Sequence, residues 1–430
     1  MIGDKDFYGL GIAPGILKVL DKYGFKHPTP IQMRSIPVVT EGKDLVGVAQ
    51  TGTGKTLAFG IPMIQRVLQG RGTGLVVLPT RELALQVREA LQQVGGPLGI
   101  RTAVLIGGAP MGRQVSEMRR QPQIVIGTPG RIIDHLEQKT LNLSSVKILV
   151  LDEADRMLDM GFAPQLNKIL RFVPAERQTL LFSATMPPEI VRMARAFMKL
   201  PVQIEIAPQG TAAANVTHEV FVLAREQKTA LLSKLLGDYR GAVLVFMRTK
   251  FGAKKVARDV RNMGYTAAEL HSNRSLGQRR DALEGFRNGR YRVLVATDIA
   301  ARGIDVTGIE LVLNYDLPDQ AEDYVHRIGR TGRAGASGHA ISFATPDQRR
   351  DLQTIERLIK KSLPVGKLPE SLPRVQFSPA ERSFGRPPAR KFGSNRPFSG
   401  KPRPGGFQRD RFKRGRVGGH RERRGHHFSS

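Results

Sequence analysis

One stretch of the sequence decides the fold: Leu45-Val46-Gly47-Val48-Ala49-Gln50-Thr51-Gly52-Thr53-Gly54-Lys55-Thr56. A short apolar run passes into a glycine-rich turn, and the residues that follow are compatible with a helix. Backbone amides of such a turn and of the helix N-terminus can converge on an anion. The spacing predicts a phosphate-binding loop in which Lys55 reaches the β- and γ-phosphates and the Thr56 hydroxyl ligates Mg²⁺. Ala49 stands where the commonest pattern has glycine, and a flexible turn between strand and helix is the alternative interpretation.

The composition of the chain favours a polyanionic partner. Its 430 residues include 67 lysines and arginines against 38 aspartates and glutamates, a formal net charge of +29. Nucleic acid is favoured over an acidic membrane surface, since no basic amphipathic helix with a bulky apolar face stands out. The chain has no cysteine, which excludes disulfides and thiolate metal sites. Because no apolar run approaches the roughly 20 residues that cross a bilayer and no secretion signal stands at the N-terminus, we expect a cytoplasmic protein without membrane contact.

Short apolar runs recur along the chain and alternate with amphipathic segments such as 81–94 and 132–138. Since these runs lack polar alternation, they predict parallel sheets that are buried on both faces. A polar, Ala/Gly-rich stretch at 208–215 divides them into two series, which predicts two α/β domains over 1–207 and 216–362 joined by a linker. The expected strands are 74–78, 103–106, 123–126, 147–151 and 179–182 after the opening run, then 219–223, 242–246, 292–296, 310–314 and 340–343.

The composition changes after the second series, and residues 363–430 are expected to form a disordered tail. Residues 371–430 contain 16 lysines and arginines against 3 acidic residues, together with seven phenylalanines. Such a segment cannot bury enough apolar surface to offset the entropy of ordering it. Arginines interleaved with phenylalanines suit phosphate contact and base stacking. A purely solubilising tail is the alternative.

A cluster of carboxylates, Asp152-Glu153-Ala154-Asp155, directly follows the apolar run 147–151. Parallel α/β sheets place their ligands at the carboxyl ends of the strands. A phosphate-binding loop with Mg²⁺ needs a carboxylate from a neighbouring strand, a role that suits Asp152, while Glu153 could orient or deprotonate the attacking water. Taken alone, the cluster would be read as a solvated turn or a helix cap.

These residues lie within an ordered series of motifs. With that series, the chain resembles the DEAD-box RNA helicases of superfamily 2 over residues 7–345, and around His271 and in its tail it looks most like the bacterial RhlE group. It departs from the family where Ser272-Asn273 replaces the usual Gly-Asp pair. The matching segments are Gly24-Phe25, Pro28-Thr29-Pro30-Ile31-Gln32, Ala49–Thr56, Pro79–Ala84, Gly107-Gly108, Thr128–Arg131, Asp152–Asp155, Ser183–Thr185, Ala296–Asp305 and His326–Arg333.

The resemblance implies two tandem RecA-like domains with parallel sheets, a disordered basic C-terminal tail, and a site for ATP and Mg²⁺. Phe25 would stack on the adenine and Gln32 would hydrogen-bond its edge, while Asp305 would contact the ribose. The implied nucleotide-binding residues are Phe25, Gln32, Ala49, Gln50, Thr51, Gly52, Thr53, Gly54, Lys55, Thr56 and Asp305. The implied catalytic residues are Lys55, Asp152, Glu153, Arg330 and Arg333, the last two as arginine fingers, and Mg²⁺ would be held by Thr56 and Asp152, partly through water.

The resemblance also implies an RNA site and residues that couple it to ATP. Small residues and backbone amides suit phosphates and 2′-hydroxyls, so recognition is expected to be largely independent of sequence. The implied RNA-binding residues are Arg81, Gly108, Thr128, Gly130, Arg131 and Thr297. The implied coupling residues are Asp155, Ser183, Thr185 and His326.

The expected mechanism is closure of the two domains on ATP and RNA, which bends one strand so that its partner dissociates. This predicts local, non-processive unwinding by a monomer, with ribosomal precursors or RNA-decay proteins as possible partners. A superfamily 2 DNA translocase is the alternative enzyme, distinguished by whether RNA or DNA stimulates ATP hydrolysis. An RNA chaperone that acts through its tail is the alternative outside enzymes, and deletion of residues 371–430 would separate it from a helicase.

Overall fold

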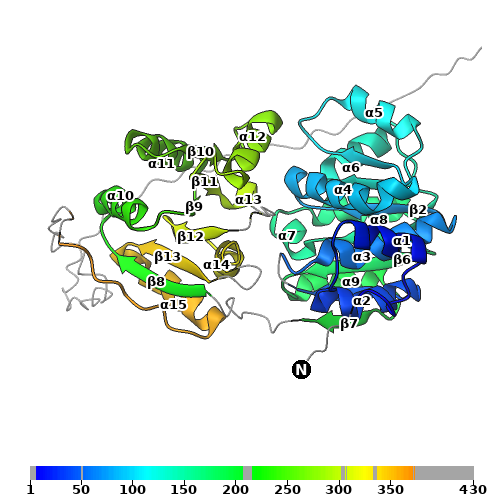
Figure 1. Cartoon of the computed structure of the whole chain (residues 1–430), viewed down its shortest axis with the longest axis horizontal. Helices are drawn as coiled ribbons and strands as arrows, with labels where there is room; N and C mark the ends of the chain where they lie inside the picture. The colour runs from blue at the N-terminus through cyan, green and yellow to red at the C-terminus, as the bar shows by residue number, and fades with distance from the viewer. Residues whose placement is uncertain are drawn as a thin grey trace, which may run out of the picture. The chain divides into compact units, whose positions relative to one another are not determined.

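The computed structural model describes residues 6–49, 52–206, 216–301, 306, 308–332, 337–370 and 372. Two all-parallel sheets organise these residues, and each is covered by helices (Figure 1). The expected linker at 208–215 and nearly all of the expected tail lie outside the described residues. Among the residues described, none of the helices combines the length and apolar character that a membrane crossing requires.

The first domain contains a seven-stranded sheet in the order β3-β4-β2-β5-β6-β1-β7. Its strands are β1 (Leu45–Val48), β2 (Thr73–Val77), β3 (Thr102–Leu105), β4 (Ile124–Gly127), β5 (Val146–Leu151), β6 (Gln178–Ser183) and β7 (Val202–Glu205). Its helices are α1 (Pro14–Lys22), α2 (Pro30–Thr40), α3 (Lys55–Leu68), α4 (Arg81–Gly95), α5 (Met111–Arg119), α6 (Pro129–Glu137), α7 (Ala154–Asp159), α8 (Ala163–Phe172) and α9 (Pro188–Phe197), with a 3-10 turn at Gly96–Leu98.

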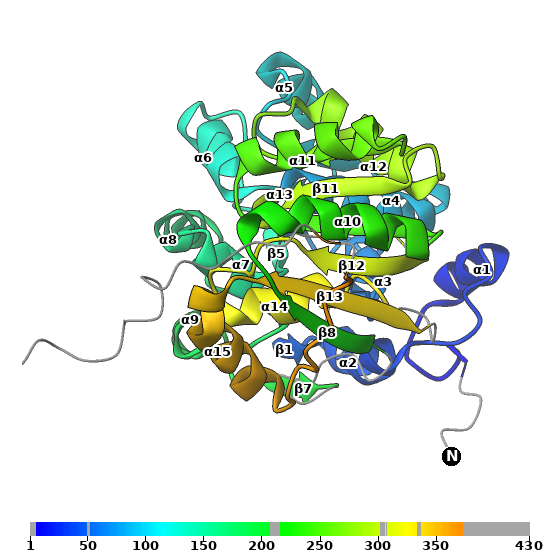
Figure 2. The ribbon, with the colours of Figure 1, turned by 90° about the vertical axis from the view of Figure 1, so that its left-hand side faces the viewer.

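The second domain contains a six-stranded sheet in the order β10-β11-β9-β12-β13-β8, and Figure 2 looks onto its strands. The strands are β8 (Val216–Val222), β9 (Ala242–Met247), β10 (Ala267–Leu270), β11 (Val293–Thr297), β12 (Ile309–Asn314) and β13 (Gly338–Ala344). The helices are α10 (Lys228–Asp238), α11 (Lys250–Asn262), α12 (Leu276–Arg287), α13 (Asp298–Ala301), α14 (Ala321–Ile328) and α15 (Arg349–Ile359), with 3-10 turns at Arg225–Gln227 and Pro346–Gln348.

Apolar side chains pack on both faces of each sheet. In the first domain, one cluster joins the sheet to α1–α4, and a second joins it to α6–α9. In the second domain, α10 and α11 cover one face, while α12 to α15 contribute to two clusters on the other. Burial on both faces explains why the strands read as continuous apolar runs.

All ten expected strands are present, with ends that differ by up to three residues, but β7 and β10 were not predicted. Ordered contacts also continue past residue 362, into the segment assigned to the tail. Val365 forms a parallel bridge with Val220, and Leu363 and Leu372 are buried. These residues therefore pack with the second domain.

A buried histidine on β8 makes the stability of the second domain depend on pH. His218 places Nδ1 3.1 Å from the Tyr324 hydroxyl. Burial, with a smaller effect from Lys361, lowers the pKa of His218 to about 4. An unfolded histidine has a pKa near 6.5. Protons therefore bind the unfolded chain preferentially below pH 6.5, and this destabilisation increases until the pH falls below about 4.

We expect this histidine to remove about 2 kcal/mol of stability from the second domain between pH 7.5 and pH 5. Hydrogen exchange of the β8 and β13 amides, corrected for the intrinsic effect of pH, measures the loss. The His218→Gln variant should lack this part of the pH dependence. An equal loss in the variant and the original chain would assign the effect to other groups.

Candidate nucleotide and RNA site

The first sheet brings distant motifs to one edge. The loop before α3 follows β1, Asp152 follows β5, and Ser183 ends β6. These three strands are neighbours and run in parallel, so their carboxyl ends lie at the same edge of the sheet. A hydrogen bond from the Ala49 amide to the Ser183 carbonyl, 3.0 Å long, joins two of the motifs directly.

The described part of the phosphate loop has the backbone that its sequence predicts. Gly52 and Gly54 have φ values of +85° and +91°, and α3 begins at Lys55. Lys55 is buried, and its Nζ donates a 3.0 Å hydrogen bond to the Ala49 carbonyl. Thr56 lies in the first turn of α3 and is partly exposed. The helix N-terminus and a cation therefore meet at the place where phosphates are expected.

Gln32 connects the expected adenine motif to the phosphate loop. Its Oε1 accepts from the Thr29 amide at 2.9 Å, as part of a capping box that begins α2. Its Nε2 donates to the Gly54 carbonyl at 3.0 Å. A Cβ atom at residue 54 would lie 2.5 Å from that Nε2, so only glycine allows this approach. Phe25 is partly exposed beside the core that contains Phe7.

Asp152 and Glu153 follow β5 and are both buried. Burial raises the pKa of Asp152 to about 6, and nearby Glu153 adds to the rise while Lys55 opposes it. Asp152 Oδ1 accepts from the Glu153 amide at 2.9 Å. Glu153 has φ +51° and ψ +50°, a left-handed conformation that is costly for a residue with a side chain. Asp152 is thus held close to the buried Lys55, with Glu153 beside it.

Asp155 forms a network with the residues expected to couple the two sites. Its Oδ2 accepts from the amides of Ala184 and Thr185 and from the Thr185 hydroxyl, at 3.0, 2.9 and 3.0 Å. The Asp155 amide donates to Ser183 Oγ at 3.3 Å, and that hydroxyl donates to the Thr185 carbonyl at 2.7 Å. The turn after β6 is therefore fixed to the first turn of α7.

The RNA-binding residues expected in the first domain lie after β2, β3 and β4, which are adjacent strands. Arg81 begins α4, and its guanidinium lies so close to Gly108 that a Cβ atom there would collide with it. Arg131 donates from Nη1 to the Ala109 carbonyl at 3.1 Å. Thr128 occupies the N-cap position of α6, and Gly130 is exposed in the first turn of that helix. Cations and backbone amides therefore share one surface.

In the second domain, the buried Arg327 binds several neighbouring side chains, although it was not among the site residues predicted from the sequence. Its Nε and Nη2 donate to the two oxygens of Asp298 at 2.5 and 2.6 Å, and its Nη1 donates to Asn314 Oδ1 at 3.1 Å. Asp298 directly follows Thr297, the RNA-binding residue expected at the end of β11. The position of Arg327 between two predicted functional residues of one motif was the available signal.

Arg330 and His326 are placed beside this centre. Arg330 is buried just after α14, and its Nε donates to the His326 carbonyl at 3.2 Å. Both residues line a small cavity with Arg327 and with Arg156. Arg156 of α7 forms a 2.9 Å ion pair with Asp323 of α14. The predicted site residues Gln50, Thr51, Asp305 and Arg333 lie outside the described residues.

Comparisons with known proteins agree with this geometry. Residues 29–193 match the DEAD/DEAH box helicase family, and residues 227–335 match the helicase conserved C-terminal domain. The chain is 45% identical over 361 residues to the ATP-dependent RNA helicase CshA of Listeria monocytogenes, covering 83% of this chain and 69% of that protein. It is 40% identical over 364 residues to the ATP-dependent rRNA helicase RRP3 of Debaryomyces hansenii, covering 84% and 76%.

A solved structure extends the similarity to the whole fold. Dbp5 of S. cerevisiae, bound to RNA and ADP BeF3, matches with a TM-score of 0.76 and 30% identity, covering 84% of this chain and 95% of that one. The two sheets are thus tandem RecA-like domains. The chain belongs to the DEAD-box family of ATP-dependent RNA helicases.

Proposed function

We propose that this chain couples RNA-stimulated ATP hydrolysis to local, non-processive separation of RNA strands. The observation that carries the proposal is the convergence of Lys55, Asp152 and Glu153 at one sheet edge, next to the strands that carry Arg81 and Arg131. One edge of a single rigid sheet thereby serves both phosphate chemistry and backbone contact.

The residues present fit a Mg²⁺ ion. Asp152 is a buried carboxylate whose pKa is raised mainly by loss of solvent, so a nearby cation would favour its charged form. Thr56 is a partly exposed hydroxyl residue in the turn that begins α3. Oxygen ligands of this kind are those that Mg²⁺ prefers, usually with several waters retained. When bound, the ion would neutralise charge that develops on the phosphates.

The protein groups have distinct roles in the proposed reaction. Lys55 would leave the Ala49 carbonyl and donate to the β- and γ-phosphates. Glu153 would orient the attacking water and accept its proton. Arg330, together with Arg333, would stabilise the charge of the transition state. The Asp155 network would transmit the state of this edge to the turn at Ser183–Thr185, with His326 as the contact in the second domain.

The finer identity of the protein also belongs to this proposal. We place it with the RhlE group because of the sequence around His271 and the Arg/Gly-rich tail. One relative is an rRNA helicase, which supports ribosomal precursor RNA as a substrate. We further propose a monomer that acts in the cytoplasm.

ATP turnover with and without nucleic acid tests the function. We expect single-stranded RNA to stimulate hydrolysis and DNA of the same sequence to have little effect, because the expected contacts include 2′-hydroxyls. Lys55→Ala should lower the stimulated rate by about 10²–10³-fold, since a preorganised cation facing the phosphates is lost. Equal stimulation by DNA would favour a DNA translocase. A Lys55→Ala variant with unchanged turnover would reject the assigned site.

A further inference from the structure

A basic cavity lies at the edge of the first sheet opposite the ATP site. It is lined near the amino ends of β1, β2, β5, β6 and β7, and its volume is about 580 Å³. The phosphate loop and Asp152 follow the carboxyl ends of these parallel strands. Since strands of four to six residues rise about 3.3 Å per residue, roughly 13–20 Å of sheet separates the two edges. The cavity is therefore outside the site described above.

Five cations and one carboxylate line this cavity. They are Arg66, Arg71, Lys147, Arg177, Lys199 and Glu176. Among the described residues, none of the five cations forms an ion pair with a carboxylate, Glu176 included. Five cations that outnumber the carboxylates around them repel one another, and a bound anion would relieve that repulsion.

Neutral groups hold two of these arginines in place. Arg66 Nη1 donates to Gln178 Oε1 at 3.2 Å, and Gln178 is anchored in turn by bonds to the Val39 and Lys43 carbonyls. Arg177 donates to the Thr179 hydroxyl and to two backbone carbonyls, at distances from 2.8 to 3.4 Å. These partners orient the guanidinium groups without cancelling their charge.

The nearby carboxylate of Asp44 is already engaged. Its oxygens accept from the backbone amides of Thr179 and Lys199 at 2.8 and 2.7 Å. Burial lowers the pKa of Arg66, with Arg71 adding to the effect, and burial also lowers the pKa of Arg177 despite Asp44. Burial thus makes the charged forms of Arg66 and Arg177 less favourable.

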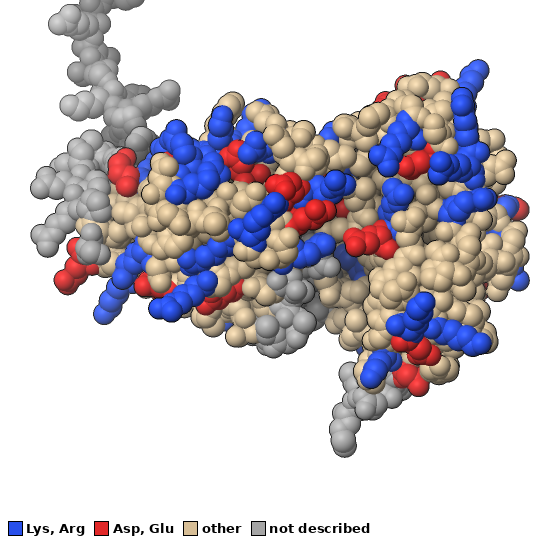
Figure 3. All heavy atoms as spheres, turned by 45° about the horizontal axis from the view of Figure 1, so that its top comes forward, with Lys and Arg blue, Asp and Glu red and all other residues tan. Residues whose placement is uncertain are grey.

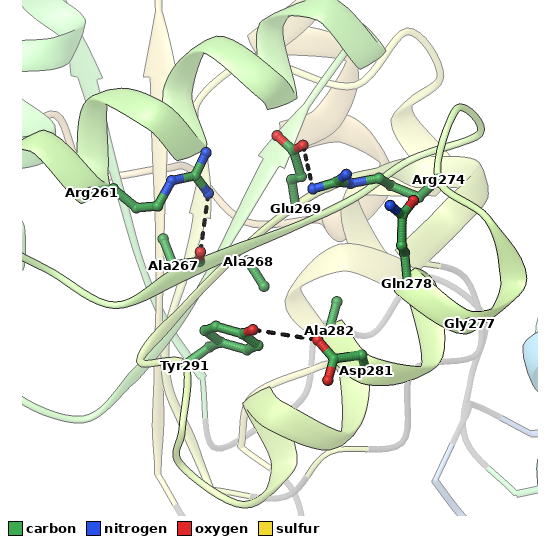
Figure 4. A pocket seen from close by; sticks show the side chains of 10 residues that line it. All are labelled: Arg261, Ala267, Ala268, Glu269, Arg274, Gly277, Gln278, Asp281, Ala282 and Tyr291. Carbon is green, nitrogen blue, oxygen red and sulfur yellow. Dashed lines mark hydrogen bonds and ion pairs between the residues drawn. The ribbon is translucent and has the colours of Figure 1, made fainter.

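A cavity in the second domain has a more balanced lining, with two arginines and two carboxylates (Figure 4). There Arg274 lies 2.7 Å from Glu269, and Arg261 donates to the Ala267 carbonyl at 3.1 Å. Figure 3 likewise shows Asp and Glu side chains among the Lys and Arg side chains of the face in view. The cavity in the first domain therefore differs from this one in gathering five cations beside a single lining carboxylate.

We propose that this cavity is a second RNA-binding site, which holds backbone phosphates of an RNA segment that extends beyond the helicase site. Its lining contains no aromatic side chain on which a base could stack. Phosphate contact alone would give binding without sequence preference. The proposal rests on the RNA helicase function. It adds a second contact with the flanking RNA, away from the site of strand separation.

Two exposed cations of the cavity allow a test in the full chain. Arg71→Glu with Lys199→Glu reverses charge without removing the hydrogen bonds of Arg66 or Arg177. The matched control is Lys18→Glu with Arg195→Glu, which makes the same change in net charge at exposed positions on α1 and α9. Binding is measured over a range of salt concentrations with a short RNA of about 8 nucleotides and with the same RNA carrying a long single-stranded extension.

We expect the cavity variant to bind the extended RNA roughly tenfold more weakly and to reduce its salt slope by about 1.4, the value for two lost phosphate contacts. Binding of the short RNA, and the ATP turnover that it stimulates, should stay unchanged. The control should lose little affinity for either RNA. If ATP turnover on the short RNA is absent in every chain, the helicase function itself fails, which is a separate result.

Other outcomes would overturn the second site. An equal loss in the control would show a general effect of net charge, and an equal loss with the short RNA would place the cavity residues in the main site. A calorimetric titration with inorganic tripolyphosphate tests whether the cavity binds a small phosphate anion and not RNA. If it binds the original chain but not the cavity variant, while extended RNA binds both equally, the cavity serves a small anion and the RNA proposal is wrong.

Discussion

Replacing Glu153 by glutamine should slow RNA-stimulated ATP hydrolysis by about 10²–10⁴-fold, the usual contribution of a positioned general base. The amide keeps the size of the side chain and can still orient a water, but it cannot accept a proton at neutral pH. Nucleotide affinity should change little, because Lys55 and the amides of the phosphate loop remain. Single-turnover hydrolysis and equilibrium binding of ATP measure the two quantities separately.

The matched control for this variant is Glu89→Gln, which makes the same chemical change at an exposed position on α4. It should hydrolyse ATP at the original rate. A Glu153→Gln rate within tenfold of the original would remove Glu153 from the role of base. A parallel loss of ATP binding would instead assign Glu153 to nucleotide binding.

Arg327→Ala should destabilise the second domain by about 3–5 kcal/mol, since it removes one partner of a buried ion pair. Asp298 would lose both of its bonds to the guanidinium, and Asn314 Oδ1 would lose a donor. The alanine would also vacate the space above the Phe246 ring, where the guanidinium now lies 5.1 Å from the ring centre. Urea denaturation measures the loss in the free energy of unfolding, and hydrogen exchange of the β11 and β12 amides shows whether the loss lies in the second domain.

The control is Arg280→Ala, which removes an exposed pair with Glu284 on α12, 3.7 Å apart. Such a pair contributes only about 0.3–0.5 kcal/mol. If Arg327→Ala costs less than about 1 kcal/mol, the pair with Asp298 does not hold β11 and α14 together as we describe. The comparison also isolates burial as the cause, since both changes remove one arginine.

The sequence predicted the central strands well because their burial leaves a continuous apolar signal. It missed β10, whose Ala-Ala-Glu-Leu sequence has little intrinsic preference for a strand and which forms by pairing with β11 at the sheet edge. It also missed β7, another edge strand, which follows Pro201 and is half exposed. Each of these two strands forms against a neighbour that lies outside its own stretch of sequence.

The site was predicted as a set of residues but not as a set of contacts. The motif order placed Asp155 and Thr185 in one functional group, yet only the fold shows that one carboxylate oxygen accepts three hydrogen bonds at the turn after β6. The pairing of Arg327 with Asp298 spans 29 residues and had no local signal. The basic cavity could not be predicted for the same reason, because its five cations come from four separate segments.

In the proposed nucleotide site, the hydrogen bond between Lys55 and the Ala49 carbonyl makes ATP binding an exchange of partners. The lysine must give up an acceptor that is already inside the loop before it can serve the phosphates, so nucleotide affinity reflects the difference between two bonds. The Ala49 carbonyl thereby competes with the phosphates for the Lys55 ammonium group. The free energy needed to break this bond is the same for the bound ground state and for the transition state, so the competition weakens nucleotide affinity without slowing hydrolysis of the bound nucleotide.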